Sequence, residues 1–177
     1  MNVYHVVTER PMHKGQLIIF DAQHHNGVYH RVTAFEQILK GERVTEPLHS
    51  LISADMDKWA KVAYRELALE QIRQQEYSQY PSRMACLYTS NSLDEAYNWA
   101  NFFQDIGRDV FSIVKLNVEG TIFTGDARNC FDGVGDNQID FIKARNYWAL
   151  NTLTDNPVLE TLVAGKITVD EIVITYK

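Results

Sequence analysis

The spacing of apolar residues along the chain predicts an α+β protein in which short strands alternate with amphipathic helices. Period-two alternation or short apolar runs predict strands over residues 2–8, 17–20, 86–88, 110–118, 121–124 and 169–176. Apolar residues at helical spacing predict helices over 33–40, about 53–77, 93–106, 138–150 and 156–163. The strands over 110–118 and 121–124 are expected to be separated by a turn at Glu119-Gly120.

The stretch from Cys86 to Ala100 organises this pattern, because it combines a strand, a polar turn and a clearly marked helix start. Ser92 and Glu95 have the spacing of a capping box, and Gly107 closes the helical pattern. Tyr88 then ends the strand and Tyr97 lies in the second turn of the helix. Two such rings can flank one space and hold a flat, electron-poor ring. The alternative is that both tyrosines are ordinary residues at the edge of the core.

Length, net charge and the lengths of apolar runs indicate what kind of protein this is. The chain has 177 residues, of which 45% are hydrophobic, and a formal charge of −6, so we expect one domain spanning residues 1–177. The acidic balance argues against nucleic-acid binding. No apolar run approaches the roughly 20 residues that span a bilayer, and the first residues do not form a signal peptide, so we expect no membrane association and a cytoplasmic location.

Two segments with chemically active residue types do not match known ligand patterns. His24 and His25 are adjacent and have no further ligands at metal-binding spacing, so no metal site is expected. The segment 125–136 carries three glycines and three aspartates, and is interpreted as a functional loop. Its glycines do not follow the pattern that cradles phosphate in nucleotide-binding loops.

Three of the expected strands each carry one unusual residue: His5 in the first, Tyr88 in the middle and Glu171 at the start of the last. In this order they resemble the His–Tyr–Glu signature of the ADP-ribosyltransferase superfamily. The matching motifs are Tyr4-His5, the run 88–91 followed by Ala96-Tyr97, and Glu171 before a β-branched run. The run 80–88 also resembles an uncharacterised bacterial family grouped with this fold. The resemblance implies a split β-sheet core with flanking helices.

The resemblance also implies an activity, namely cleavage of the nicotinamide–ribose bond of NAD through an oxocarbenium-like transition state. Glu171 would stabilise the positive charge that develops on the ribose. His5 would hydrogen-bond the adenosine-side ribose, and Tyr88 and Tyr97 would offer aromatic faces to the nicotinamide. The backbone of Val6 and the matched polar residue Ser90 complete the expected NAD-contacting set. NAD is the expected substrate, with an acceptor that the sequence does not identify.

Two departures from the family pattern affect these expectations. Val6 stands where the family has glycine, and its β-carbon limits close approach of a ligand to the backbone. Val169 stands where the arginine-modifying branch has a second Glu or Gln, so arginine modification is not expected. Asp126, in the glycine-rich loop, is a reserve candidate for the acidic role.

Three functional alternatives follow from the sequence. The leading one is an NAD-dependent ADP-ribosyltransferase or NAD glycohydrolase. The second is a catalytically degenerate module of the same fold that binds NAD, ADP-ribose or a protein partner, an alternative prompted by Val6. The third is an RNA 2′-phosphotransferase, which shares the fold but grips two phosphates with arginines and histidines, so that the acidic composition makes it the weakest.

Overall fold

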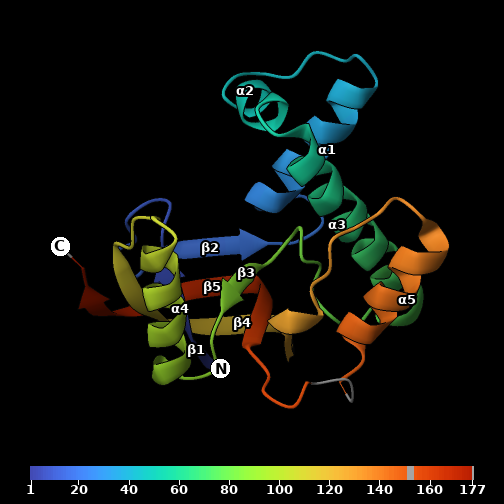
Figure 1. Cartoon of the computed structure of the whole chain (residues 1–177). Helices are drawn as coiled ribbons and strands as arrows, with labels where there is room; N and C mark the ends of the chain where they lie inside the picture. The colour runs from blue at the N-terminus through green and yellow to red at the C-terminus, as the bar shows by residue number, and fades with distance from the viewer. Residues whose placement is uncertain (151–153, 177) are drawn as a thin grey trace.

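An antiparallel sheet of five strands forms the centre of the computed structural model, which describes residues 1–150 and 154–176 (Figure 1). The strands are β1 (Asn2–Val7), β2 (Leu17–Phe20), β3 (Leu87–Thr89), β4 (Ser112–Asp126) and β5 (Leu159–Thr175). Their order is β1-β4-β5-β2, and β3 also pairs with β5. Helices flank this sheet, so the expected α+β class, with mixed helices and strands, is confirmed.

The two longest strands differ from the sequence prediction. The expected turn at Glu119-Gly120 is wrong, because β4 runs through it while pairing with β5 from Ser112 to Asp126. Gly120 lies opposite Gly165, and a β-carbon at Gly120 would lie 1.9 Å from the carbonyl oxygen of Ala164. Glycine is therefore needed here for close approach of two strands rather than for chain reversal.

The expected helix over 156–163 is also wrong, because residues from Leu159 onward belong to β5. Thr161, Leu162 and Val163 are fully buried in succession. Leu162 packs in the core cluster that contains Phe123 and Trp148, whereas Val163 points to the other face of the sheet and packs in the cluster that contains Val3 and Leu116. A strand that is covered on both faces loses the period-two alternation that marks a half-exposed strand. The short apolar run therefore carried no signal that separates strand from helix.

The described helices are α1 (Gly27–Leu39), α2 (Leu48–Ser53), α3 (Met56–Glu76), α4 (Leu93–Asp105) and α5 (Asn137–Trp148), with a single 3₁₀ turn η1 (Ala127–Asn129). Helix α4 begins as predicted, with the Ser92 hydroxyl accepting the Glu95 backbone N–H. Helix α1 begins earlier than predicted, because Asn26 is its N-cap and accepts hydrogen bonds from two backbone N–H groups.

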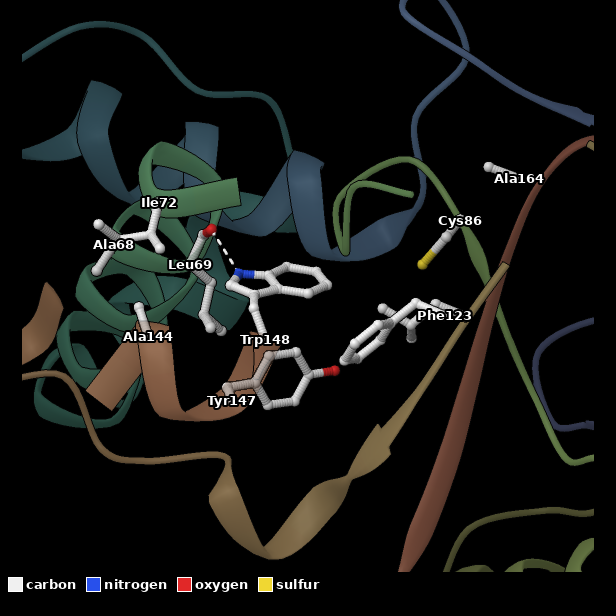
Figure 2. Packing of buried hydrophobic residues seen from close by; sticks show 10 residues of the cluster. Ala68, Leu69, Ile72, Cys86, Phe123, Ala144, Tyr147, Trp148 and Ala164 are labelled. Carbon is white, nitrogen blue, oxygen red and sulfur yellow. Dashed lines mark hydrogen bonds between the residues drawn. The ribbon is translucent and has the colours of Figure 1, made fainter. Parts of the chain in front are cut away.

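The helices form two groups around the sheet (Figure 1). Helices α1, α2 and α3 extend from one end of the sheet, and α5 packs against α3, whereas α4 packs against β1 and β4. Figure 2 shows Tyr147 and Trp148 of α5 beside Phe123 of β4, with the Trp148 indole nitrogen donating a 2.9 Å hydrogen bond to the Leu69 carbonyl of α3. Among the described residues, none of the helices combines the length and hydropathy that crossing a membrane requires.

Candidate functional site

A cavity opens where β1 and β3 separate. The two strands are joined by one pair of hydrogen bonds between the backbones of Tyr4 and Ser90, at 2.9 and 2.8 Å. One residue further along β1, the contact with β3 passes through a side chain instead, because His5 Nδ1 lies 2.8 Å from the Tyr88 carbonyl oxygen. The resulting cavity, called here the β1–β3 cavity, has a volume of about 710 Å³ and is bordered by residues of β1, β3, the start of α1, α4 and the start of β5.

The backbone of Val6 faces this cavity. Backbone hydrogen-bonding groups alternate between the two sides of a strand, so the N–H and C=O of Val6 point the same way as those of Tyr4, toward β3. The Val6 side chain is instead buried against Ala96 and Ala100 of α4. The valine therefore keeps a polar backbone edge at the cavity while its side chain belongs to the core.

His5 is neutral and its tautomer is set by its partner. A carbonyl oxygen only accepts, so Nδ1 carries the hydrogen that is donated to Tyr88, and Nε2 is left as an acceptor. Burial is the main reason that the pKa of His5 lies below its ordinary value of 6.5. The imidazole that borders the cavity is thus suited to accept a hydrogen bond from a ligand hydroxyl.

Glu160 brings a carboxylate to the same cavity from the start of β5. Its Oε1 accepts hydrogen bonds from Arg83 Nη1 at 2.5 Å and from the Tyr147 hydroxyl at 2.6 Å. Its Oε2 makes no hydrogen bond to a described residue, and the side chain is 12% exposed. The pairing of Thr89 with Thr161, continued by one residue, places Glu160 beside Ser90. One carboxylate oxygen is therefore anchored and the other is free.

A buried network of charges anchors Glu160 from behind. Arg83 also donates from Nε to Glu66 Oε2 at 3.0 Å, and Glu66 accepts a second charged hydrogen bond from Arg65. The Arg83 guanidinium lies between the rings of Tyr88 and Tyr147, with its carbon 5.3 and 4.9 Å from their centres. This network contains two carboxylates and two guanidinium groups, so its charges balance.

Glu66 is the most deeply buried carboxylate of that network, with a relative exposure of 1%. Burial alone would raise the pKa of Glu66, but the charges of Arg83 and Arg65 outweigh it and hold the pKa below the ordinary 4.5. Glu66 is therefore ionised, and it supplies a counter-charge that Arg83 needs in order to remain inside the protein.

The structure does not bring Glu171 to the β1–β3 cavity. The expectation that Glu171 opens the last strand is wrong, because β5 begins at Leu159, and Glu171 lies near its far end. There it is exposed and pairs in register with Lys115 of β4, beyond the part of β5 that contacts β3. The carboxylate on this strand that borders the cavity is Glu160.

Tyr97 also lies away from the position that the sequence predicts. It is 38% exposed and does not border the cavity, but is close enough to Tyr176 to contribute, after burial, to the raised pKa of that residue. Residues two apart on a helix point about 200° apart, so α4 turns Trp99 to the cavity instead. The Trp99 indole nitrogen donates to the Leu159 carbonyl, next to Glu160. Tyr88 does border the cavity, as predicted, although Arg83 occupies one face of its ring.

Asp126, the reserve acidic candidate, holds the chain before β5. It is 1% exposed and accepts hydrogen bonds from the backbone N–H groups of Arg128, Thr154 and Val158. It does not border the cavity. Within residues 1–150 and 154–176, no group of three or more His, Cys, Asp or Glu side chains has an arrangement that could hold a metal ion.

A family model matches residues 3–175, almost the whole chain. The chain belongs to the DUF2441 family. The description of this family is "protein of unknown function", so membership gives no activity to the cavity. No curated protein matches the sequence. The function of this DUF2441 chain must therefore be argued from the residues of the site.

Sequence reasoning missed Glu160, Arg83 and Trp99. Glu160 had a signal, because it precedes the run Thr161-Leu162-Val163 much as Glu171 precedes Ile172-Val173-Ile174. Arg83 lies just before β3, and the residues around it in the sequence include no acidic residue that would indicate a buried ion pair. Trp99 was overlooked because Tyr97, two residues earlier, matched the family motif and was taken as the aromatic site residue.

Proposed function

We propose that this DUF2441 chain has the ADP-ribosyltransferase-like split-sheet fold and is an NAD-dependent ADP-ribosyltransferase or NAD glycohydrolase, with Glu160 in the role first expected of Glu171. One observation carries the proposal. His5, Tyr88 and Glu160, whose Oε2 makes no hydrogen bond to a described residue, border a single cavity at the place where two strands separate. The His–Tyr–Glu resemblance found in the sequence supports the same assignment, with the third residue moved to the start of β5.

Glu160 has the geometry that the chemistry needs. Loss of nicotinamide leaves positive charge on the ribose, and a fixed carboxylate stabilises that charge where it develops. Arg83 and Tyr147 hold Oε1, so the side chain is already positioned before substrate binds and Oε2 remains available to the sugar. The acceptor of the ADP-ribosyl group is water in a glycohydrolase and a second substrate in a transferase.

The other cavity residues provide suitable contacts for the rest of NAD. The N–H and C=O of Val6 match the donor and acceptor of a carboxamide, and Ser90, whose backbone pairs with Tyr4, borders the same cavity. The indole of Trp99 offers an aromatic face for a cationic ring, a role first expected of Tyr97. The Nε2 atom of His5 accepts a hydrogen bond from a ribose hydroxyl.

The second candidate is a module that binds NAD or ADP-ribose without chemistry. It is favoured by the direct contact between Arg83 and Glu160, because a paired guanidinium reduces the negative potential that a carboxylate offers to a cationic transition state. Under this alternative, the network would keep the cavity in shape and the free oxygen of Glu160 would only accept a ligand hydrogen bond.

The test is nicotinamide release from NAD by the wild-type protein, Glu160→Gln and Glu171→Gln. We expect Glu160→Gln to lose about 10²–10³-fold in rate, which is the effect of removing one preorganised electrostatic contact, and Glu171→Gln to match the wild type. Thermal unfolding of each variant verifies that it is folded. Stabilisation by NAD without turnover in the wild type would select the binding module. An absence of both turnover and stabilisation would refute both candidates.

A further inference from the structure

The mouth of the β1–β3 cavity is rich in arginine although the chain as a whole is acidic. Arg10, Arg31 and Arg108 border the cavity and come from three separate segments, the loop after β1, helix α1 and the turn after α4. Against these three charges the cavity is bordered by two carboxylates, Glu9 and Glu160, and that of Glu160 is already paired with the buried Arg83. In a chain with a formal charge of −6, this local excess of positive charge indicates an anionic ligand.

Arg31 is held at the cavity rather than extended into solvent. Its side chain is 30% exposed, and its Nη2 lies 2.8 Å from the point where a β-carbon of residue 27 would stand. Gly27 therefore leaves the space that the guanidinium occupies. The same Nη2 is 3.5 Å from Glu9 Oε1, so a carboxylate already lies against this guanidinium. Planar guanidinium groups bind carboxylates and phosphates with the same geometry.

Arg108 is held in place by two contacts. Its Nη2 donates a 2.7 Å hydrogen bond to the Thr8 hydroxyl, and its guanidinium carbon lies 4.6 Å from the centre of the Phe103 ring. After burial and the hydrogen bond to Tyr88, the charges that act on the pKa of His5 are those of Glu9, which raises it, and Arg108, which lowers it. Both charged groups therefore lie near the imidazole that borders the cavity.

We propose that Arg31 and Arg108, with Arg10 at the rim, form a diphosphate-binding subsite at the mouth of the β1–β3 cavity. The ligand class is a nucleoside diphosphate or a dinucleotide that contains one. The carboxylate of Glu9 competes with the diphosphate for Arg31. The subsite extends the proposed function, because it selects the whole dinucleotide over nicotinamide mononucleotide, but its affinity for ADP does not depend on NAD cleavage.

The experiment is calorimetric titration of ADP and of inorganic pyrophosphate into the wild-type protein and four variants. We expect Arg31→Gln and Arg108→Gln each to weaken ADP binding by about tenfold to a hundredfold, the range for losing a charge-assisted hydrogen bond. Glu9→Gln should tighten binding, since it removes the competing carboxylate. Arg43→Gln, an exposed arginine that does not border the cavity, is the control and should leave binding unchanged.

The outcomes separate this subsite from the proposed function. ADP binding with the expected variant pattern, but no nicotinamide release, would support the subsite and leave only the enzymatic proposal refuted. NAD cleavage whose KM is unchanged by Arg31→Gln and Arg108→Gln would refute the subsite alone. Failure of ADP and pyrophosphate to bind the wild type, or weaker binding by Glu9→Gln, would also overturn it. Thermal unfolding verifies that each variant is folded. If Arg31→Gln does not fold, the test rests on Arg108→Gln, because Arg108 is exposed.

Discussion

The two ends of β5 carry the same residue type in opposite environments. At the first end, Glu160 lies where β5 pairs with both β3 and β4, and its side chain meets Arg83 and a tyrosine hydroxyl. At the other end, Glu171 lies where β5 pairs with β4, and its side chain is exposed opposite Lys115. A carboxylate in the first setting is oriented and partly desolvated, whereas one in the second is screened by water.

This difference shows that a candidate site carboxylate is distinguished by what surrounds it rather than by the residues that follow it. Both glutamates precede a run of strand-forming residues. Only the first borders a cavity and has a buried counter-charge, which Arg83 supplies from the segment before β3. Arg83 in turn is paired with Glu66 of α3, so the surroundings of Glu160 depend on a helix that is distant in sequence.

The largest effect is expected when the buried network at the first end of β5 is broken. Glu66→Gln removes one negative charge from a site that keeps both Arg83 and Arg65. Leaving a buried charge without its partner typically costs about 3–5 kcal/mol of stability. We expect the free energy of unfolding to fall by that amount in urea titrations followed by tryptophan fluorescence.

The matched control is an exposed ion pair that involves the same strand. Glu119 of β4 lies 3.8 Å from Lys166 of β5, and both side chains are more than half exposed. Exposed pairs contribute about 0–1 kcal/mol, so Glu119→Gln should lower stability by much less than Glu66→Gln. Equal losses in the two variants would mean that the network is not the buried support described above.

Much of the fold was predictable from local signals. The Ser92 cap of α4, the apolar run of β2 and the alternation of β1 all mark elements that the structure confirms. Gly120 was misinterpreted because a glycine that permits close approach of two strands looks the same in sequence as a glycine that ends an element. That distinction depends on the neighbouring strand, which local patterns do not contain.

The candidate site was less predictable, because it depends on pairing across the sheet. His5 and Tyr88 were expected on strands, and the structure places them on β1 and β3, where both border the β1–β3 cavity. Glu160 was missed because it was assigned to a helix, and the buried run that follows it has no strand periodicity. Arg83 and Glu66 meet only through tertiary packing, so neither had a local signal of its role.

Acid should weaken the buried network that holds Glu160 at the first end of β5. The pKa of Glu66 is lowered by Arg83 and Arg65 against the effect of burial, so its ionised form stabilises the folded chain. That contribution is complete above the ordinary pKa of 4.5 and is lost as pH falls through the lower folded value. Glu66→Gln cannot titrate at this position. The difference in unfolding free energy between the wild type and Glu66→Gln should therefore shrink below about pH 4.5. Urea titrations over a series of pH values measure this difference. A difference that widens on acidification would contradict the conclusion that Glu66 is ionised.

The smallest effect tests how firmly Glu160 is held. Tyr147→Phe removes the hydroxyl that donates to Glu160 Oε1 and accepts from Arg83 Nη1, while Arg83 keeps its own contact with Glu160 Oε1. We expect a stability loss of about 1.5–3 kcal/mol, the usual range for a hydrogen bond to a charged group, and, if the chain cleaves NAD, a kcat about tenfold lower with KM unchanged. Tyr80→Phe is the control, because Tyr80 packs in the same aromatic cluster and its hydroxyl makes no hydrogen bond to a described residue. A split in which Tyr147→Phe lowers kcat and Tyr80→Phe does not would assign Tyr147 to positioning of Glu160. Equal behaviour of the two variants would leave Arg83 as the group that orients the carboxylate.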